Sequence, residues 1–253
     1  MSWTAPNLQN KHCFFGRKGG VSKGEFAGLN VSPKGCANEE ELVQNLGLIA
    51  KFFDLERKNL ALLNQGVSAE VFYIEHPSRF ELTGDGMVTD KPNIILGLRT
   101  ADCAPVLLED KQNNVIGAAH AGWRGALKGV IEKTIDLMIK KGADLQNITA
   151  AIGPCIAQDS YEVDDVFYQT FTAKDKNYEK YFVCKKDKHF QFDLECFCID
   201  RLKNYGIKNV EASGCDTYAN EDEYYSFRRF THKGTVKANG GFAAQLSAIV
   251  MRE

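Results

Sequence analysis

The chain of 253 residues contains no apolar run near the roughly 20 residues that a membrane-spanning helix requires. Its first residues, Met1 to Asn7, lack the basic and apolar regions of a signal peptide. The eight cysteines are scattered, and no Cys-x-x-Cys pair predicts a closed zinc knuckle. We therefore expect a cytoplasmic protein with reduced thiols and no membrane partner.

A strong charge of one sign is also missing. The formal net charge is −2, which gives no basic footprint for nucleic acid. Hydrophobic residues at 44% and charged residues at 25% are ordinary for a globular protein, and no fixed-period repeat interrupts the chain. We expect a single domain over residues 1–253, long enough to bury about three quarters of its unfolded surface.

No Gly-x-Gly-x-x-Gly fingerprint is present, so a doubly wound dinucleotide-binding sheet is not favoured. Helical spacing of apolar residues and short extended runs instead alternate along the chain, which predicts an α/β fold: one mixed β-sheet packed by helices. The strands at 70–75 and 93–98 could enter one sheet, with a turn at 84–86 between them. The expected helices are 39–53, 126–141, 165–171 and 194–205, a polar and aromatic loop surrounds 224–229, and further strands are expected at 106–109, 115–119, 148–152, 210–212 and 245–251.

Two consecutive apolar runs carry the residues of greatest chemical interest. The polar turn at 110–114 predicts that the runs on either side of it form a hairpin. Cys103 and His120 lie at the same outer end of that hairpin, so we expect their side chains to meet. A thiolate and an imidazole are standard zinc ligands, although a catalytic zinc commonly takes a third protein ligand.

A buried thiol and a hydrogen-bonded core histidine are the more common roles for arbitrary residues of these types. The glycines and the tryptophan that flank His120 favour a functional role here. Asp102 could orient His120, bind a substrate amine or hydroxyl, or only form a turn. No Gly-x-Ser-x-Gly elbow supports a serine hydrolase, and Cys155 is interpreted as a packed loop thiol.

Anion binding is a further possibility that the sequence leaves open against ordinary structural roles. Guanidinium groups grip phosphate through paired hydrogen bonds, and backbone amides of a glycine turn can do the same. The candidates for this role are Arg17, Gly19, Gly20, Arg124, Arg228 and Arg229.

Several motifs together resemble the YfiH-like family, whose members are variously labelled laccase-domain protein, multicopper polyphenol oxidase, peptidoglycan editing factor and purine nucleoside phosphorylase. The resemblance spans nearly the whole chain and implies the single-domain α/β fold of that family. It also adds Asn30 to the candidate substrate-binding residues. The matching motifs are Gly-Gly-Val-Ser22, Leu29-Asn30, Thr-Ala-Asp-Cys-Ala-Pro-Val106, Ala-His-Ala-Gly-Trp-Arg-Gly125, Ile-Gly-Pro-Cys-Ile156, Phe192-Asp193-Leu194 and Phe-Arg-Arg229.

By this resemblance, Cys103 and His120 are two of three zinc ligands around an open pocket. The third is a histidine in a Gln-Val-His motif, and Val67 stands at its place in this chain. His76 could substitute only if the loop were rebuilt. The family's Asn-Arg pair also departs here, because Leu46 follows Asn45 and removes an arginine.

The resemblance implies a purine nucleoside phosphorylase that cleaves adenosine, inosine, guanosine or methylthioadenosine with phosphate, using Cys103, His120 and Asp102. A zinc-dependent adenosine deaminase activity would accompany it. Two other enzyme activities stay open, removal of misincorporated serine from a muropeptide precursor and, with least support, polyphenol oxidation. A nucleoside-binding homologue with a weakened metal site is the non-enzymatic alternative. The expected partners are purine nucleosides and phosphate, and the expected assembly is a monomer or small homo-oligomer.

Overall fold

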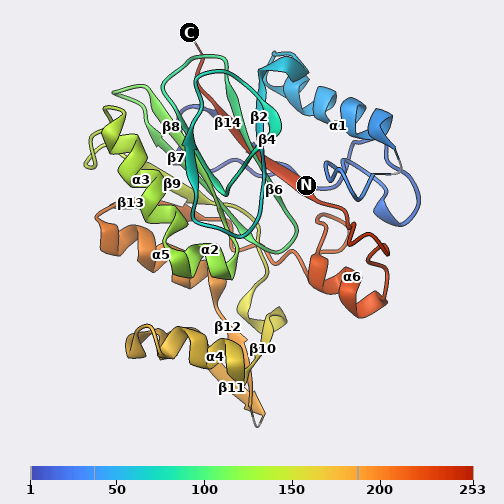
Figure 1. Cartoon of the computed structure of the whole chain (residues 1–253), viewed down its shortest axis with the longest axis vertical. Coiled ribbons are helices and arrows are strands. Elements are labelled where there is room, and N and C mark those ends of the chain that lie inside the picture. Colours follow the sequence, from blue (N-terminus) through green and yellow to red (C-terminus); the bar gives the residue numbers. More distant parts are fainter. Residues whose placement is uncertain (1, 37, 187, 253) are drawn as a thin grey trace.

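The computed structural model describes residues 2–36, 38–186 and 188–252, and two β-sheets that pack face to face form its framework (Figure 1). The five-stranded sheet has the spatial order β1 (Lys11–Phe14), β14 (Gln245–Val250), β6 (Ile95–Thr100), β2 (Leu60–Asn64) and β4 (Arg79–Thr83). The six-stranded sheet has the order β13 (Asn209–Ala212), β9 (Thr149–Ile152), β7 (Ala104–Asp110), β8 (Val115–Ala121), β5 (Gly86–Thr89) and β3 (Val71–Tyr73). Both sheets mix parallel and antiparallel pairs.

The core between the two sheets explains the long apolar runs of the sequence. Every residue of β7 and β8 is buried, because one face of these strands meets the other sheet and the opposite face meets helices. Leu98 of β6 packs with Leu107 of β7 and Ile116 of β8 in the layer between the sheets.

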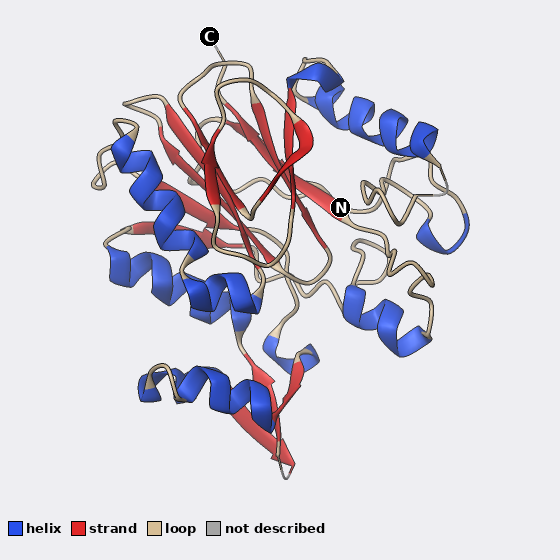
Figure 2. Ribbon diagram, in the orientation of Figure 1, coloured by secondary structure: helices blue, strands red, loops and turns tan. Residues whose placement is uncertain are grey.

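Helices cover the outer faces of both sheets (Figure 2). The helix α1 (Glu39–Phe52) packs through Leu46 and Ile49 on the five-stranded sheet, and its N-cap Asn38 accepts a hydrogen bond from the Glu41 N–H. The helices α2 (Trp123–Lys128), α3 (Val130–Lys140) and α5 (Leu194–Tyr205) cover the six-stranded sheet. Gly129 separates α2 from α3, since its φ of 91° is left-handed and interrupts the helix.

A small lobe projects below the two sheets in Figure 1. It consists of α4 (Asp165–Thr172) and a three-stranded sheet with the order β10 (Glu162–Asp164), β12 (His189–Phe192) and β11 (Phe182–Lys186). Stacked and tilted aromatic rings fill its interior, with Phe167 and Phe171 at its centre. The remaining elements are α6 (Phe227–Lys233) and the 3-10 helices η1 (Gly24–Phe26), η2 (Arg57–Asn59), η3 (Gln158–Ser160) and η4 (Lys176–Tyr181).

The predicted mixed α/β fold is confirmed, and so is the antiparallel hairpin of β7 and β8, but the described strands form three sheets where one was expected. Three further expectations are wrong. The strands near 70–75 and 93–98 lie in different sheets, the helix predicted over 126–141 is two helices, and the loop predicted around 224–229 leads into α6 with Ser226 as its N-cap. None of the described helices is long and apolar enough to cross a membrane.

Candidate active site

A cavity of about 690 Å³ opens at the end of the two sheets where β6 and β7 meet. The segment between these strands, the end of β8, the starts of α2 and α6, and the loop after β2 all contribute to its wall. Its lining residues are Ser32, Gln65, Val67, Arg99, Thr100, Ala101, Asp102, Cys103, His120, Trp123, Ile156, Tyr161, Leu194, Phe227, Arg228, Thr231, His232, Phe242 and Ala244.

Cys103 and His120 meet in this cavity, as the hairpin predicts. The ladder of β7 and β8 pairs Ala104 with Ala121 and Pro105 with His120, so the residue before β7 lies beside the end of β8. The Cys103 thiol is partly exposed, whereas the His120 side chain is only 8% exposed. Both side chains line the cavity.

Asp85 orients His120, and the sequence did not identify it. Its Oδ1 lies 2.7 Å from Nδ1 of His120. The backbone carbonyl of Asp85 also accepts the His120 N–H at 2.7 Å, so both the backbone and the ring of the histidine are fixed. The Gly84-Asp-Gly86 sequence predicted only a turn, because nothing local indicates that its aspartate faces a histidine 35 residues away.

The contact between Asp85 and His120 favours the charged form of both groups. Burial by itself would raise the pKa of Asp85, but hydrogen bonds from His120 and Ser68 outweigh it and lower the pKa to about 2. Burial opposes charge on His120 as well, yet interactions with Cys103 and Asp85 raise its pKa to about 9. An ionised carboxylate accepts hydrogen bonds only, so Nδ1 of His120 is the donor and the other ring nitrogen remains for Cys103 and the cavity.

Asp85 also shapes the loop that carries Val67. Its carboxylate accepts the backbone N–H groups of Gly66, Val67 and Ser68, the last at 2.5 Å, and the Ser68 hydroxyl at 2.7 Å. Val67 adopts a left-handed φ of 52°, which is rare for a β-branched residue. The loop thus holds an aliphatic side chain against the wall of the cavity.

Zinc does not fit the donor set of this cavity. Val67 lies close to Cys103, since a Cβ built on Gly122 would be 3.3 Å from Cγ1 of Val67 and 3.0 Å from Sγ of Cys103. Valine supplies no ligand atom. Within residues 2–36, 38–186 and 188–252, no three His, Cys, Asp or Glu side chains are grouped to hold a metal ion, so neither a three-ligand zinc site nor a multicopper centre is assembled.

His76 cannot replace the missing ligand. It is exposed and follows the end of β3, where Tyr73 pairs with Val88 of β5. Gly86, which neighbours Asp85, lies at the other end of these strands beside Val71. His76 is therefore at the far end of β3 from the cavity.

Asp102 does not orient His120, in contrast to one of the predicted roles. Its carboxylate accepts the Thr217 hydroxyl at 2.7 Å, the Ser226 hydroxyl at 3.0 Å and the backbone N–H of Arg228 at 2.7 Å. Burial raises its pKa, against these hydrogen bonds, which lower it. Asp102 also has a φ of 88°, so a strained residue joins the cavity wall to the start of α6.

Three of the candidate binding residues, Arg228, Arg124 and Asn30, lie in the cavity wall or close to it. Arg228 lines the cavity, and its guanidinium lies 5.5 Å from the Tyr161 ring centre. Arg124 lines an adjoining hollow and stacks on Trp123 at 4.2 Å. Asn30 is buried behind the wall, where its side-chain oxygen accepts the N–H groups of Ser32 and Ala244.

The other candidates do not reach the cavity. Arg229 directs its guanidinium at the carbonyls of Thr217, Tyr218 and Tyr224, which fixes the loop before α6. The structure likewise separates Arg17, Gly19 and Gly20 from Cys103. The Arg17 guanidinium donates hydrogen bonds to the carbonyls of Ala27 and Glu221, outside the cavity.

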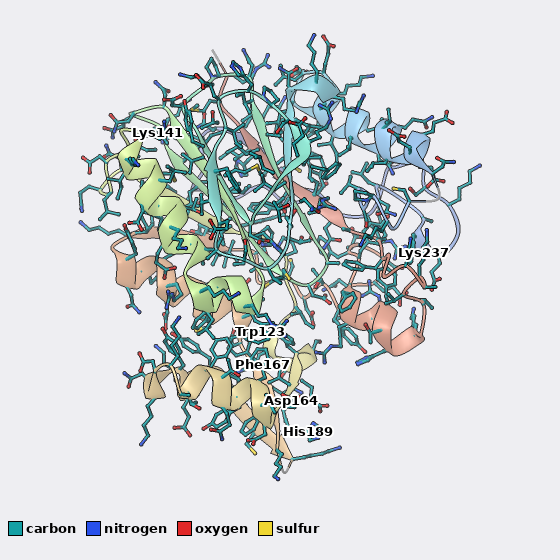
Figure 3. All side chains as sticks on the ribbon, viewed as in Figure 1. Trp123, Lys141, Asp164, Phe167, His189 and Lys237 are labelled. Atoms are coloured by element: carbon teal, nitrogen blue, oxygen red, sulfur yellow. The ribbon has the colours of Figure 1, made fainter. Side chains whose placement is uncertain are left out.

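Aromatic side chains form much of the remaining wall. Phe227 and Phe242 lie on the α6 side with ring centres 4.7 Å apart. Trp123 lies on the other side at the start of α2, and Figure 3 shows it above Phe167 of the lobe, with which its ring makes contact at 4.5 Å. Flat aromatic faces of this kind bind planar heterocyclic bases by stacking.

Comparisons with known proteins show which proteins this chain is similar to. The family model described as multi-copper polyphenol oxidoreductase laccase matches residues 11–247. The chain is 39% identical to a purine nucleoside phosphorylase of Rickettsia prowazekii over 77% of this chain and 80% of that protein. It is 34% identical to a purine nucleoside phosphorylase of Deinococcus radiodurans over 89% of this chain and 86% of that protein.

Solved structures show the same fold. The hypothetical protein YfiH of Bacillus licheniformis superimposes with a TM-score of 0.86 at 26% identity, over 95% of this chain and 92% of that one. A protein of Neisseria meningitidis superimposes with a TM-score of 0.84 at 27% identity, over 100% of this chain and 99% of that one.

Proposed function

Because this chain belongs to the multi-copper polyphenol oxidoreductase laccase family, and relatives carry the name purine nucleoside phosphorylase, we propose that it cleaves purine nucleosides with phosphate. The substrates would be adenosine, inosine, guanosine or methylthioadenosine, and the products the free base and the corresponding ribose 1-phosphate. The observation that carries this proposal is the contact of Cys103 and His120 in an aromatic-lined cavity whose volume suits a nucleoside.

The reaction needs a proton at the leaving base. A phosphate oxygen forms a bond to C1′ of the ribose while the bond from C1′ to the base nitrogen breaks, and the electron pair leaves with the base. His120 donates a proton to the base and recovers one from hydrogen phosphate. Asp85 stabilises the imidazolium and fixes its orientation.

Cys103 and Asp102 have different tasks in this scheme. The Cys103 thiol borders both the substrate space and His120, so it holds the imidazole next to the reacting base. Asp102 is a positioning residue, because its hydrogen bonds to Ser226 and the Arg228 N–H place α6 and its aromatic side chains.

No step of this scheme passes through zinc, since the described donor set lacks a third ligand. Adenosine deamination requires an activated water, for which a metal-bound hydroxide is the usual source. The deaminase activity therefore depends on a feature that Val67 removes, and it is not part of the main proposal.

The test is phosphate-dependent release of hypoxanthine from inosine by the purified chain. We expect His120→Gln to lower turnover by about 100-fold or more, because a positioned general acid contributes that much. His189→Gln is the matched control, since His189 is exposed at the tip of the lobe (Figure 3). Equal loss in both variants, or release of base that does not require phosphate, would contradict the proposal.

Val67 supports a second candidate function, a nucleoside-binding protein without turnover. Metal analysis of the wild-type chain and of Val67→His separates the two. Turnover by wild type with far less than one zinc per chain supports the phosphorylase. Nucleoside binding without turnover in wild type, with zinc and activity gained in Val67→His, supports the binding protein.

A further inference from the structure

Arg99 is an arginine of the cavity wall that sequence analysis did not single out. It lies near the end of β6, and its backbone is fixed by Gln65, whose side chain accepts the Arg99 N–H and donates to the Arg99 carbonyl, both at 2.8 Å. Its guanidinium donates to the Leu63 carbonyl at 3.2 Å and lies 4.8 Å from the Phe80 ring centre. The side chain is therefore held in one place beside the cavity.

The charge of Arg99 has no counter-ion among the residues that the structure describes. Arg201 pairs with Glu132, and Arg229 lies 3.8 Å from Glu221 besides its three carbonyl partners. No described carboxylate lies within ion-pair distance of Arg99, and its buried Nε has no acceptor there. Burial lowers its pKa to about 10, which reflects surroundings that disfavour its charge.

A second donor without a partner follows Arg99 in the chain. The hydroxyl of Thr100 is buried in the same wall and has no hydrogen-bond partner among the described residues. Unsatisfied donors at a partly buried cation suit an anion.

The one carboxylate of the described cavity lining does not compensate the charge of Arg99. Asp102 is the one carboxylate among the described lining residues, and Thr217, Ser226 and the Arg228 N–H already occupy its oxygens. A partly buried guanidinium without a counter-ion is costly for a folded protein, and a bound anion would offset that cost.

We propose that Arg99, with the Thr100 hydroxyl, binds the inorganic phosphate that attacks the ribose. This inference rests on the proposed phosphorylase activity. A guanidinium holds phosphate through two parallel hydrogen bonds, and Arg99 can turn only a little, because Leu63 and Phe80 hold it. The phosphate would approach the ribose from the β6 wall, with Cys103 and His120 placed to receive the leaving base.

Steady-state kinetics with varied phosphate and varied inosine test this assignment. We expect Arg99→Gln to raise KM for phosphate about tenfold or more with little change in KM for inosine, since charge-assisted hydrogen bonds are lost. Thr100→Val keeps the side-chain size and should raise KM for phosphate by a smaller factor. Arg17→Gln is the matched control, because Arg17 lies outside the cavity.

Titration calorimetry with inorganic phosphate alone separates this inference from the proposed activity. Phosphate binding to wild type and Arg17→Gln, but not to Arg99→Gln, upholds the subsite even if no purine nucleoside turns over. Equal binding by wild type and by folded Arg99→Gln and Thr100→Val variants, no phosphate binding by wild type, or loss only in Arg17→Gln would overturn it.

Discussion

Two segments of the cavity wall, the β7 and β8 hairpin and the loop after β2, hold their side chains in place by different physical means. The β7 and β8 hairpin places Cys103 and His120 through a regular ladder of paired residues. The loop after β2 places Val67 through a carboxylate from a distant turn and a left-handed backbone. A position fixed by a ladder follows from nearby sequence, whereas a position fixed by Asp85 depends on contacts that no local pattern announces.

Removing the carboxylate that joins the two segments should have the largest effect. In Asp85→Asn a neutral amide replaces the carboxylate that accepts hydrogen bonds from the 66–68 backbone, the Ser68 hydroxyl and His120. We expect a loss of about 3 kcal/mol in the free energy of unfolding, measured by urea denaturation, because the partners stay buried. Asp54→Asn is the control, since the Asp54 side chain is 76% exposed. A loss below about 1 kcal/mol in Asp85→Asn would show that the loop does not depend on this charge.

The dependence of the unfolding free energy on pH, measured below pH 5, gives a second test of the role of Asp85. The pKa of Asp85 is about 2 in the folded chain against an ordinary 3.8, so its stabilisation is fully present above about pH 4. It is lost as the pH falls toward 2, by roughly 2 kcal/mol in total. The difference in unfolding free energy between wild type and Asp85→Asn should therefore shrink between pH 5 and pH 2. A difference that stays constant over this range would assign the effect to shape alone.

These two segments also show how far sequence reasoning reached. The polar turn and the apolar runs predicted the hairpin, and the hairpin predicted the meeting of Cys103 and His120. Asp85 and Arg99 escaped prediction because each acts on residues far along the chain. Arg17 is a predicted anion ligand because a guanidinium grips phosphate and glycines lie beside it, but its partners are the carbonyls of Ala27 and Glu221.

The elements of the fold also differ in whether nearby sequence or distant contacts determine them. The helix ends of α1, α4 and α5 follow from caps and periodicity, which are local. Assignment of the strands to sheets depends on long-range pairing, so the sequence left open that β3 and β6 share a sheet, which they do not. The start of α6 was missed because Ser226 caps it from within a polar and aromatic run.

A methyl group at the contact between the segments should have an intermediate effect. The Cβ of Gly122→Ala would approach Sγ of Cys103 at 3.0 Å and Cγ1 of Val67 at 3.3 Å. We expect a loss of about 1.5 kcal/mol in unfolding free energy and a lower kcat, because the side chains of Cys103 and Val67 must shift. Gly47→Ala in α1 is the control, since its Cβ meets nothing within 4 Å, and it should raise stability by about 0.5 kcal/mol. Equal effects of both changes would mean that Cys103 and Val67 do not pack tightly against Gly122.

A substitution that relieves the left-handed backbone of Val67 should have the smallest effect on stability, and it should stabilise the chain. Val67→Asn removes a β-branched side chain from a φ of 52°, a conformation that asparagine tolerates, and Val67 is already 37% exposed. We expect the unfolding free energy to rise by about 1 kcal/mol. Val183→Asn is the control, because Val183 is 45% exposed in the extended strand β11 and should lose about 0.5 kcal/mol. Opposite signs for the two exposed valines would show that the backbone of Val67 is strained in the folded chain, and equal losses would show that it carries no strain.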